Sequence, residues 1–523
     1  MKKIRLAGNQ TAHLIAYHQK KRVPLIFYGI ITGVFAGAVS CLYRFLVDEL
    51  SGLSVGIYGY LNKHPGFIAL WFLALMLLAL AVRFIIKAEP LIRGSGIPQI
   101  EGELKGRIDM NWWRVLLAKF TGGLLCLFAG FSLGREGPSI QLGGAAGKGV
   151  TRLFKRPDAE EKYMITGGAS AGLAAAFNAP LAGVIFSLEE VHGHFSPAVL
   201  LTAMSSAIVA DLISKFAFGG NAVLEFKALP VLPLQWLPYL VILGVVLGAG
   251  GALFNGVILK TQDLYAKIPE KYRLFIPFAV CCAVGLFLPM ALGGGHGVIL
   301  SVSSGNTGFA LLLILLAVRF AFTMVCFGSG APGGIFLPLL TIGALLGAIF
   351  GKSLAGVAAL EQTYVPTFIA LAMAGYFAAV VRAPVTGIIL ITEMTGSFSH
   401  LLSLSIIVII SYLAAELCRS KPIYESLLER LLRRQGNAGG GEARKEIIEI
   451  VVYLDSMLDG KKIRDVSWPE KSLIVGIRRG SEEIIPNGET VLGSGDTLIF
   501  ITDTDRAASA RHKIQKLATT THY

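Results

Sequence analysis

The sequence predicts an all-α polytopic membrane protein with two related halves, broken helices and a small α+β domain at the C-terminus. Of the 523 residues, 54% are apolar and only 15% are charged, whereas about 25% of a soluble domain is charged. Apolar segments fill most of the chain from Val23 to Leu417, and one apolar pattern occurs twice. This composition excludes a soluble enzyme as the main interpretation, and also a disordered or collagen-like chain.

The basic N-terminal segment, residues 1–22, is expected to lie in the cytoplasm. It holds six Lys and Arg residues and no acidic residue, and basic segments beside membrane helices stay on the cytoplasmic side. The apolar stretch that follows is longer than a signal-peptide core, so we expect no cleavage. Residues 436–523 hold 12 Lys and Arg against 13 Asp and Glu, so the basic excess, +14, lies in residues 1–435. Nucleic acid is therefore not an expected partner.

Many of the apolar segments are uneven in length and interrupted by Gly and Pro. Several are too short to cross a hydrocarbon core of about 30 Å at about 1.5 Å per residue. Broken helices survive at membrane depth only where protein or a water-filled cavity satisfies their backbone, which is typical of a transporter or channel. The clearest segments are 23–47, 67–86, 113–133, 197–214, 236–259, 274–292, 309–327, 335–358, 366–381 and 401–417.

An internal repeat indicates that the membrane part consists of two related halves. Residues 174–190 read AAAFNAPLAGVIFSLEE, and residues 378–394 read AAVVRAPVTGIILITEM. Each has a Pro, a Gly three residues later and a Glu nine residues later, at an offset of 204 residues. GREGP at 134–138 and GGIFLP at 333–338 form a second pair at an offset of 200. Such repeats place the substrate site at their interface near the membrane midplane; chance similarity between two Pro-initiated helices is the alternative.

Three Gly-rich motifs that contain Pro are each predicted to open a helix: GSGIP (94–98), GREGP (134–138) and GSGAPGGIFLP (328–338). Gly permits unusual backbone angles, and Pro suits the first helical turn. A helix start exposes unpaired N–H groups and the positive end of the helix dipole, so it can hold an anion. Several starts that meet inside the membrane would hold an anion without a full positive charge, which favours anion transport over cation transport.

Glu136, in GREGP, is an ionisable residue inside a membrane segment, which makes it a functional candidate. Its carboxylate at a helix start resembles a tethered anion. It would occupy the anion site when ionised and leave that site when protonated. Anion passage and protonation would then exclude each other. The alternative is a Glu that only caps its own helix.

Three further polar residues have two interpretations each. Glu189 and Glu190 end the first repeat segment, where one of them could relay protons from the cytoplasm. The alternative is a pair of solvated carboxylates at a helix end. Tyr424 could donate its hydroxyl to an anion, although an interfacial aromatic anchor is the commoner role of such a residue. The six cysteines form no CxxC pair, so neither a disulfide framework nor a metal site is expected.

The motifs of the membrane part resemble those of the CLC chloride channel and transporter family. GSGIP, GREGP, GASAGLAAAFNAPLAG, CFGSGAPGGIFLP and KPIY occur in the order of that family, and the likeness covers about residues 23–435. The resemblance implies an antiparallel two-repeat membrane domain and a homodimer with one anion pathway in each subunit. It also implies a multi-pass protein of the cell (inner or plasma) membrane, in contact with lipid, with both termini in the cytoplasm.

The resemblance also implies roles for single residues. Glu136 would be the external gating glutamate. Glu190 corresponds to the internal proton-transfer glutamate of the exchangers, and Glu189 would lie beside the route by which protons enter. The chloride-binding groups would be the hydroxyls of Ser95 and Tyr424 and the backbone N–H groups of Ile335 and Phe336.

Two of these positions also indicate the type of transport. Ser95 favours chloride, since nitrate-selective relatives carry Pro and fluoride exporters carry Met there. An acid at position 190 is typical of the antiporters, since channels of the family usually carry an uncharged residue. The resemblance therefore predicts a secondary active H+/Cl− antiporter that is no enzyme and needs no cofactor. A passive chloride channel gated by Glu136 is the nearest alternative; a cation transporter and a ligand sensor are more distant ones.

The tail has a different character. A Gly-rich linker at 436–445 precedes segments that alternate with period two at 448–454, 472–478 and 497–502, and a helix is expected at 506–518. Residues 446–518 resemble the TrkA C-terminal (RCK-C) module of potassium-transport regulators. Such modules dimerise, and some bind small regulators such as cyclic dinucleotides, so a small regulatory ligand is a candidate partner. The predicted domains are residues 1–22, a membrane domain at 23–435 with repeats at about 23–218 and 234–420, the linker, and the tail domain.

Overall fold

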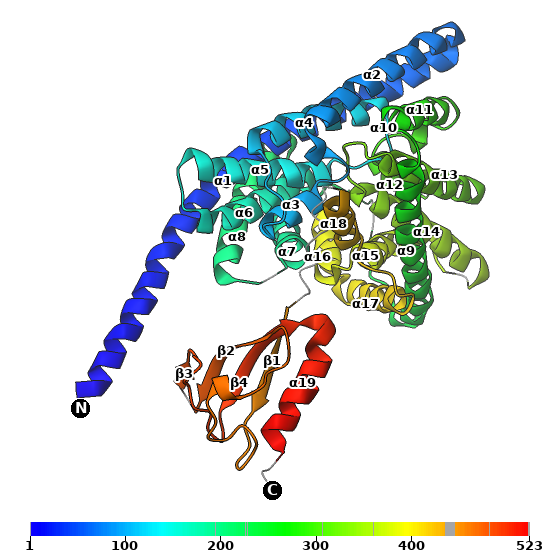
Figure 1. Cartoon of the computed structure of the whole chain (residues 1–523). Coiled ribbons are helices and arrows are strands. Elements are labelled where there is room, and N and C mark those ends of the chain that lie inside the picture. The colour runs from blue at the N-terminus through cyan, green and yellow to red at the C-terminus, as the bar shows by residue number, and fades with distance from the viewer. Residues whose placement is uncertain are drawn as a thin grey trace. The chain divides into compact units, whose positions relative to one another are not determined.

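The computed structural model forms two compact units, Met1–Leu431 and Leu432–Tyr523 (Figure 1). It describes residues 2–193, 195–224, 226, 229–305, 307–358, 360–434, 445–480 and 482–520. For residues 2–22, 158, 159, 445, 446 and 503–508 it describes the backbone alone. Each unit is considered by itself below.

The larger unit is helical, as predicted. Among the described residues, eight helical segments are long and apolar enough to cross a membrane. Its first half contains α1 (Lys2–Lys63), α2 (Ile68–Ala88), α3 (Ile97–Leu104), α4 (Trp112–Ala129), α5 (Glu136–Leu153), α6 (Asp158–Phe177), α7 (Pro180–Phe186) with a π-helical turn at Ser187–His192, and α8 (Pro197–Phe218). Its second half contains α9 (Leu237–Ala266), α10 (Glu270–Arg273), α11 (Phe275–Phe287), α12 (His296–Ser303), α13 (Phe309–Gly328), α14 (Phe336–Val357), α15 (Val365–Val381), α16 (Pro384–Thr395), α17 (Leu401–Leu417) and α18 (Ile423–Arg434).

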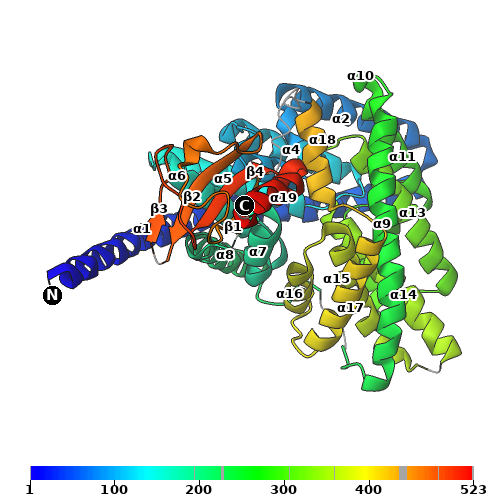
Figure 2. The same cartoon turned by 60° about the horizontal axis from the view of Figure 1, so that its bottom comes forward.

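The two halves pack their helices in the same order, as the predicted repeat requires. In the first half α4 contacts α5, α5 packs along α6, and α6 contacts α7. In the second half α13 contacts α14, α14 packs along α15, and α15 contacts α16. Figures 1 and 2 show α5, α6 and α8 on one side of the unit and α9, α14 and α15 on the other. The short helices α7 and α16 contact each other where the halves meet.

The predicted apolar segments do not include the full lengths of α5 and α6, so this part of the prediction was wrong. Nearly every residue of α5 is buried, so its surface meets protein and does not need the hydropathy of a lipid-facing span. Glycine brings the two backbones together. A Cβ atom on Gly143 would lie 2.1 Å from the carbonyl oxygen of Gly168, and one on Gly168 would lie 2.0 Å from that of Gly143.

The smaller unit is an α+β domain, as predicted. Its antiparallel sheet has the strand order β1-β4-β2-β3, and α19 packs on β1 and β4. Ile448 pairs with Phe500 and Ile477 with Leu498 in the registers of this sheet, and all four side chains are buried. The elements are β1 (Lys445–Val451), β2 (Ser472–Arg479), β3 (Glu482–Ile484), β4 (Thr497–Asp503) and α19 (Thr504–Thr519).

Two details of the tail differ from the expectation or lie beyond it. The three-residue strand β3 was not predicted, because so short a segment shows no alternation. The predicted linker at 436–445 lies outside the described residues except for Lys445, which begins β1.

One ion pair fixes the turn before β4. The guanidinium of Arg479, at the end of β2, donates to both carboxyl oxygens of Asp496 at 2.7 Å each, and the Gly493 N–H donates to the same carboxyl at 2.8 Å. Asp496 is buried, whereas the Arg479 side chain is about half exposed. The Arg479 guanidinium is therefore engaged by a carboxylate of its own domain.

We expect this pair to make the tail domain sensitive to acid. The hydrogen bonds from Arg479 lower the pKa of the Asp496 carboxyl below its ordinary value. A lowered pKa contributes stability that is complete above the unfolded-state pKa of about 4 and is lost as the pH falls through the folded value. The protection of the β2 and β4 amides against hydrogen exchange, measured in the whole protein relative to intrinsic exchange rates, should fall below about pH 4. In Asp496→Asn it should already be lower at neutral pH. Equal protection in the native protein and Asp496→Asn would contradict this role.

Candidate functional site

The three predicted helix-start motifs meet at one place inside the membrane unit. GSGIP leads into α3, GREGP into α5 and GSGAPGGIFLP into α14. The backbones of Gly134 and Gly334 exchange two hydrogen bonds of 2.7 and 2.8 Å in a short antiparallel bridge. The Gly333 N–H donates to the carbonyl oxygen of Gly94 at 3.0 Å. Backbone contacts thus join all three loops.

Glycine is required where these loops touch. A Cβ atom on Gly137 would lie 2.8 Å from the Ser95 carbonyl oxygen and 3.1 Å from the Cα atom of Gly334. Ser95 is buried at this contact. Its Oγ atom accepts a hydrogen bond of 3.1 Å from the Ile97 N–H, so the hydroxyl can still donate its own proton to another partner.

Tyr424 and Phe336 belong to one aromatic cluster. The ring of Phe336, the first residue of α14, lies 5.7 Å from the ring of Phe186 on α7. The Tyr424 ring meets the same Phe186 edge-on at 6.4 Å between centroids. Tyr424 is fully buried, and its hydroxyl has no hydrogen-bond partner among the described residues. Ile335 is the N-cap residue of α14, so its N–H and that of Phe336 belong to the group that a helix leaves without an internal partner.

Glu136 occupies the junction of the loops. It is fully buried as the first residue of α5, and neither carboxyl oxygen forms a hydrogen bond of normal geometry with the described residues. A Cβ atom on Gly134 would lie 2.1 Å from its Oε2 atom and 3.2 Å from the Leu337 nitrogen, so the carboxyl group lies beside the start of α14. A buried carboxyl without a partner calls for a functional explanation.

Glu189 and Glu393 cap each other's helices. Glu189 accepts hydrogen bonds from the N–H groups of the second and third residues of α16 at 3.2 and 2.8 Å, and from the Thr386 hydroxyl at 2.7 Å. Glu393 accepts bonds from the N–H groups of the second and third residues of α7 at 3.1 and 2.7 Å. The repeat offset of 204 residues therefore corresponds to a structural symmetry. The predicted part of Glu189 in proton transfer stays a prediction beside this structural role.

Replacing Glu189 with Ala should lower the free energy of unfolding by about 1–2 kcal/mol, since it removes a helix cap. Thermal unfolding in detergent would measure the loss, with Glu49→Ala, an exposed residue of α1, as control. Proton–chloride coupling would be measured on the same samples. Reduced coupling at native stability would support the predicted proton-transfer role and contradict a purely structural one.

Glu190 follows in the π-helical turn Ser187–His192 and is partly buried. π-Helical turns are rare and often occur at functional sites. The carboxyl groups of Glu101, Glu189 and Glu425 act on it electrostatically. Both Glu190 and Glu136 lie within electrostatic reach of the Tyr424 hydroxyl.

Two buried cations, Lys119 and Arg319, shape the site and were not predicted from the sequence. The Lys119 ammonium on α4 donates to two carbonyl oxygens of the loop before α3, including that of Gly94 at 2.6 Å. The Arg319 guanidinium on α13 donates to two carbonyl oxygens of the loop before α12, including that of Gly293 at 2.6 Å. The two residues are 200 positions apart, which matches the repeat. That spacing is the one sequence signal that could have paired them.

Comparison with known proteins agrees with this geometry. Residues 74–416 match the voltage gated chloride channel family, and residues 447–515 match the TrkA-C domain. The chain is 35% identical over 445 residues to the H(+)/Cl(-) exchange transporter ClcA of Salmonella typhimurium, across 83% of this chain and 94% of that protein. The relative of the same name from Klebsiella pneumoniae is 35% identical over 446 residues, with the same coverage.

A solved structure shows the same fold. The slow cyanobacterial Cl-/H+ antiporter superimposes with a TM-score of 0.75 and 31% sequence identity, across 79% of this chain and 99% of that one. The family match covers more than half of this chain, and it includes the GSGIP, GREGP and GSGAPGGIFLP loops. The chain therefore belongs to the voltage gated chloride channel (CLC) family, and it carries a TrkA-C domain at its C-terminus.

Proposed function

We propose that the protein is a secondary active antiporter that moves chloride across the membrane in exchange for protons. The observation that carries this proposal is the Glu136 carboxyl, which is buried where the three helix-start loops meet and forms no hydrogen bond of normal geometry with the described residues. A carboxyl at such a junction can compete with an anion for the same N–H groups. The names of the relatives support proton exchange over passive flow.

Chloride would bind between the loops and the aromatic cluster. The hydroxyls of Ser95 and Tyr424 donate to it, together with the backbone N–H groups of Ile335 and Phe336. The buried Tyr424 hydroxyl, which has no hydrogen-bond partner among the described residues, supports this arrangement, because a buried donor usually has an acceptor. Hydroxyls and helix starts supply partial charges only, so the anion can also leave.

Glu136 would act as the gate. Its ionised carboxylate occupies the anion position beside the start of α14, and protonation removes the charge that holds it there. Glu190 would pass the proton between the cytoplasm and the region of Tyr424. The electrostatic reach of Tyr424 to both glutamates supports a proton route between them. One proton carried by Glu136 then alternates with chloride, which is the basis of exchange.

We further propose where the protein lies, how it assembles and what its tail domain does. The protein is a multi-pass protein of the cell membrane with both termini in the cytoplasm, and it functions as a homodimer. The tail domain after the Gly-rich linker is a regulatory module that takes a small ligand, for which a cyclic dinucleotide is the candidate. The basic N-terminal segment supports this orientation.

Proton movement in proteoliposomes under an imposed chloride gradient tests the proposal. The purified whole protein should drive protons uphill, as an external pH electrode records while the membrane potential is clamped with a potassium ionophore. Chloride flux without proton movement would identify a passive channel gated by Glu136. Potassium flux independent of chloride, measured without the ionophore, would revive the cation-transporter alternative.

A further inference from the structure

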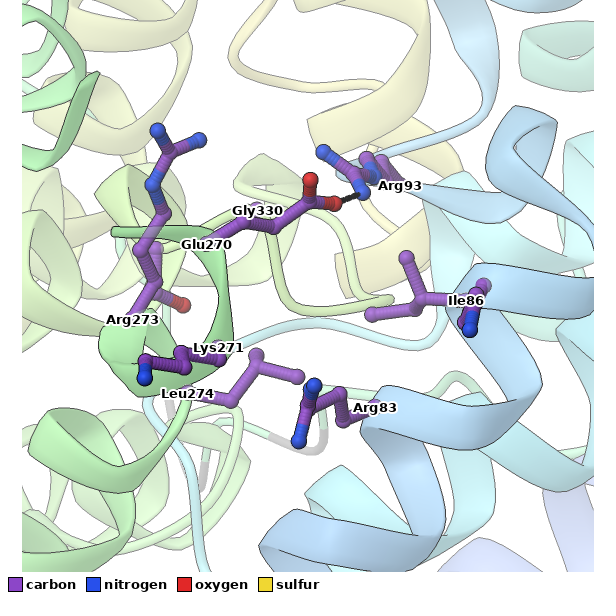
Figure 3. Close-up of a pocket in the computed structure, with 10 residues that line it drawn as sticks. Arg83, Ile86, Arg93, Glu270, Lys271, Arg273, Leu274 and Gly330 are labelled. Atoms are coloured by element: carbon purple, nitrogen blue, oxygen red, sulfur yellow. Dashed lines mark hydrogen bonds and ion pairs between the residues drawn. The ribbon is translucent and has the colours of Figure 1, made fainter. Parts of the chain in front are cut away.

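A cavity of about 310 Å³ lies beside the loop that precedes α3 (Figure 3). The end of α2, the short helix α10 and the loop after α13 enclose it. This volume is at the lower end of the range of ligand pockets, about 300–1,000 Å³, and it is far larger than one chloride ion needs. Its lining residues are Arg83, Ile86, Lys87, Arg93, Glu270, Lys271, Arg273, Leu274, Ser329 and Gly330.

The cavity is strongly basic. Five of the lining side chains are Lys or Arg, and one is acidic. That acid, Glu270, forms an ion pair with Arg93, as Figure 3 shows. In the described part of the chain, Arg83, Lys87 and Lys271 have no acidic partner within ion-pair distance. Like charges gathered at one cavity repel each other, so an anion with several charged oxygens would be stabilised there.

The position of α2 indicates which anions reach the cavity. Leu73, Leu77 and Phe84 on this helix are exposed, and only 17% of its apolar window is buried within the protein. A helix with such a surface faces lipid. Its last turns carry Arg83 and Lys87 to the cavity, and basic residues at the end of a membrane helix attract anionic headgroups.

We propose that this cavity binds a phosphate group, carried by an anionic membrane lipid or by a soluble organic phosphate. Arg83 and Arg93 offer guanidinium forks that match phosphate oxygens, and Lys87 and Lys271 add point charges. Ile86 and Leu274 supply an apolar wall, against which the carbon skeleton of the ligand packs.

A phosphate bound in the cavity would also alter the loop of the transport site. This consequence rests on the proposed function. Arg93 lies two residues before Ser95, and its carbonyl oxygen accepts a hydrogen bond of 2.6 Å from the Gln99 side chain. A bound phosphate would compete with Glu270 for the Arg93 guanidinium. The phosphate site therefore acts on the loop that positions Ser95.

Two binding measurements on the whole protein test the proposal, with the double variant R83Q/K271Q. In the lipid arm, protein equilibrated with vesicles of phosphatidylcholine and phosphatidylglycerol is analysed by native mass spectrometry for retained phosphatidylglycerol. In the soluble arm, glycerol phosphate is added to lipid-free protein in detergent, and the shift in Tm is recorded. The matched control is K63Q/K155Q, which removes two charges from exposed residues that do not line the cavity.

We expect the native protein and the control to retain phosphatidylglycerol, and R83Q/K271Q to retain several-fold less. A Tm shift by glycerol phosphate that only the cavity variant loses would instead identify a soluble ligand. Equal behaviour of native protein and cavity variant in both arms would overturn the proposal. Lys87→Gln serves as a milder variant if the double variant does not fold. These readouts measure binding, so they stand even if the protein proves to be a passive channel.

Discussion

A Glu190→Gln variant is expected to keep chloride flux and to lose all chloride-driven proton movement. Gln has the size and polarity of Glu but cannot carry a proton. Chloride binding uses groups on other elements, so its passage should continue. Proteoliposomes loaded with a pH-sensitive dye and a chloride electrode would record both fluxes in one sample.

Glu189→Gln is the comparison variant, since it changes the neighbouring carboxyl but leaves an oxygen that can still accept hydrogen bonds from the start of α16. An unchanged proton–chloride ratio would leave Glu189 a structural role alone, and a reduced ratio would support its predicted part in proton entry. Glu49→Gln, on the exposed face of α1, is the control, and its ratio should equal that of the native protein. If Glu190→Gln retains coupled proton movement, Glu190 is a structural acid and protons take another route. If both variants lose coupling, the two carboxyls act as one unit.

A Glu136→Gln variant should turn the antiporter into a passive anion pathway. The amide imitates the protonated side chain, so the gate would remain displaced from the start of α14. Proton movement should fall to background, and chloride flux should no longer depend on the external pH. Flux measurements across a series of external pH values would show this, with Glu49→Gln on the exposed face of α1 as control.

Native pH dependence of chloride flux in Glu136→Gln would contradict the gating role. So would intact proton coupling in that variant. A complete loss of chloride flux, with the protein still folded, would show that Glu136 holds the loops together and does not compete with the anion.

The sequence was sufficient for the outline of the fold and for the place of the candidate site. Gly and Pro at the start of a helix act locally, so the GSGIP, GREGP and GSGAPGGIFLP loops could be identified as helix starts from their own residues. Alternation with period two identified β1, β2 and β4 for the same reason. The repeat then placed the site where the halves meet.

The remaining features depend on partners far away in the chain. Sequence spacing showed that Glu189 and Glu393 are equivalent residues of the two repeats. It did not show that each glutamate caps the helix of the other repeat, because that depends on how α7 and α16 pack. Lys119 and Arg319 were missed because their partners are backbone carbonyl oxygens, which no residue type reveals. The full extents of α5 and α6 were missing from the predicted apolar segments because hydropathy detects lipid contact, whereas these helices mostly contact protein.

The exchanged caps of α7 and α16 also bear on how the protein is made. Residues 181 and 393, which share a hydrogen bond, are separated by 212 positions. At about 5–20 residues per second, a ribosome needs roughly 10–40 seconds to synthesise the chain between them. During that time the start of α7 lacks its carboxylate cap, although unpaired backbone groups are unfavourable in lipid. The two caps can therefore form only after most of the second half has been synthesised, which ties the completion of α7 to the arrival of α16.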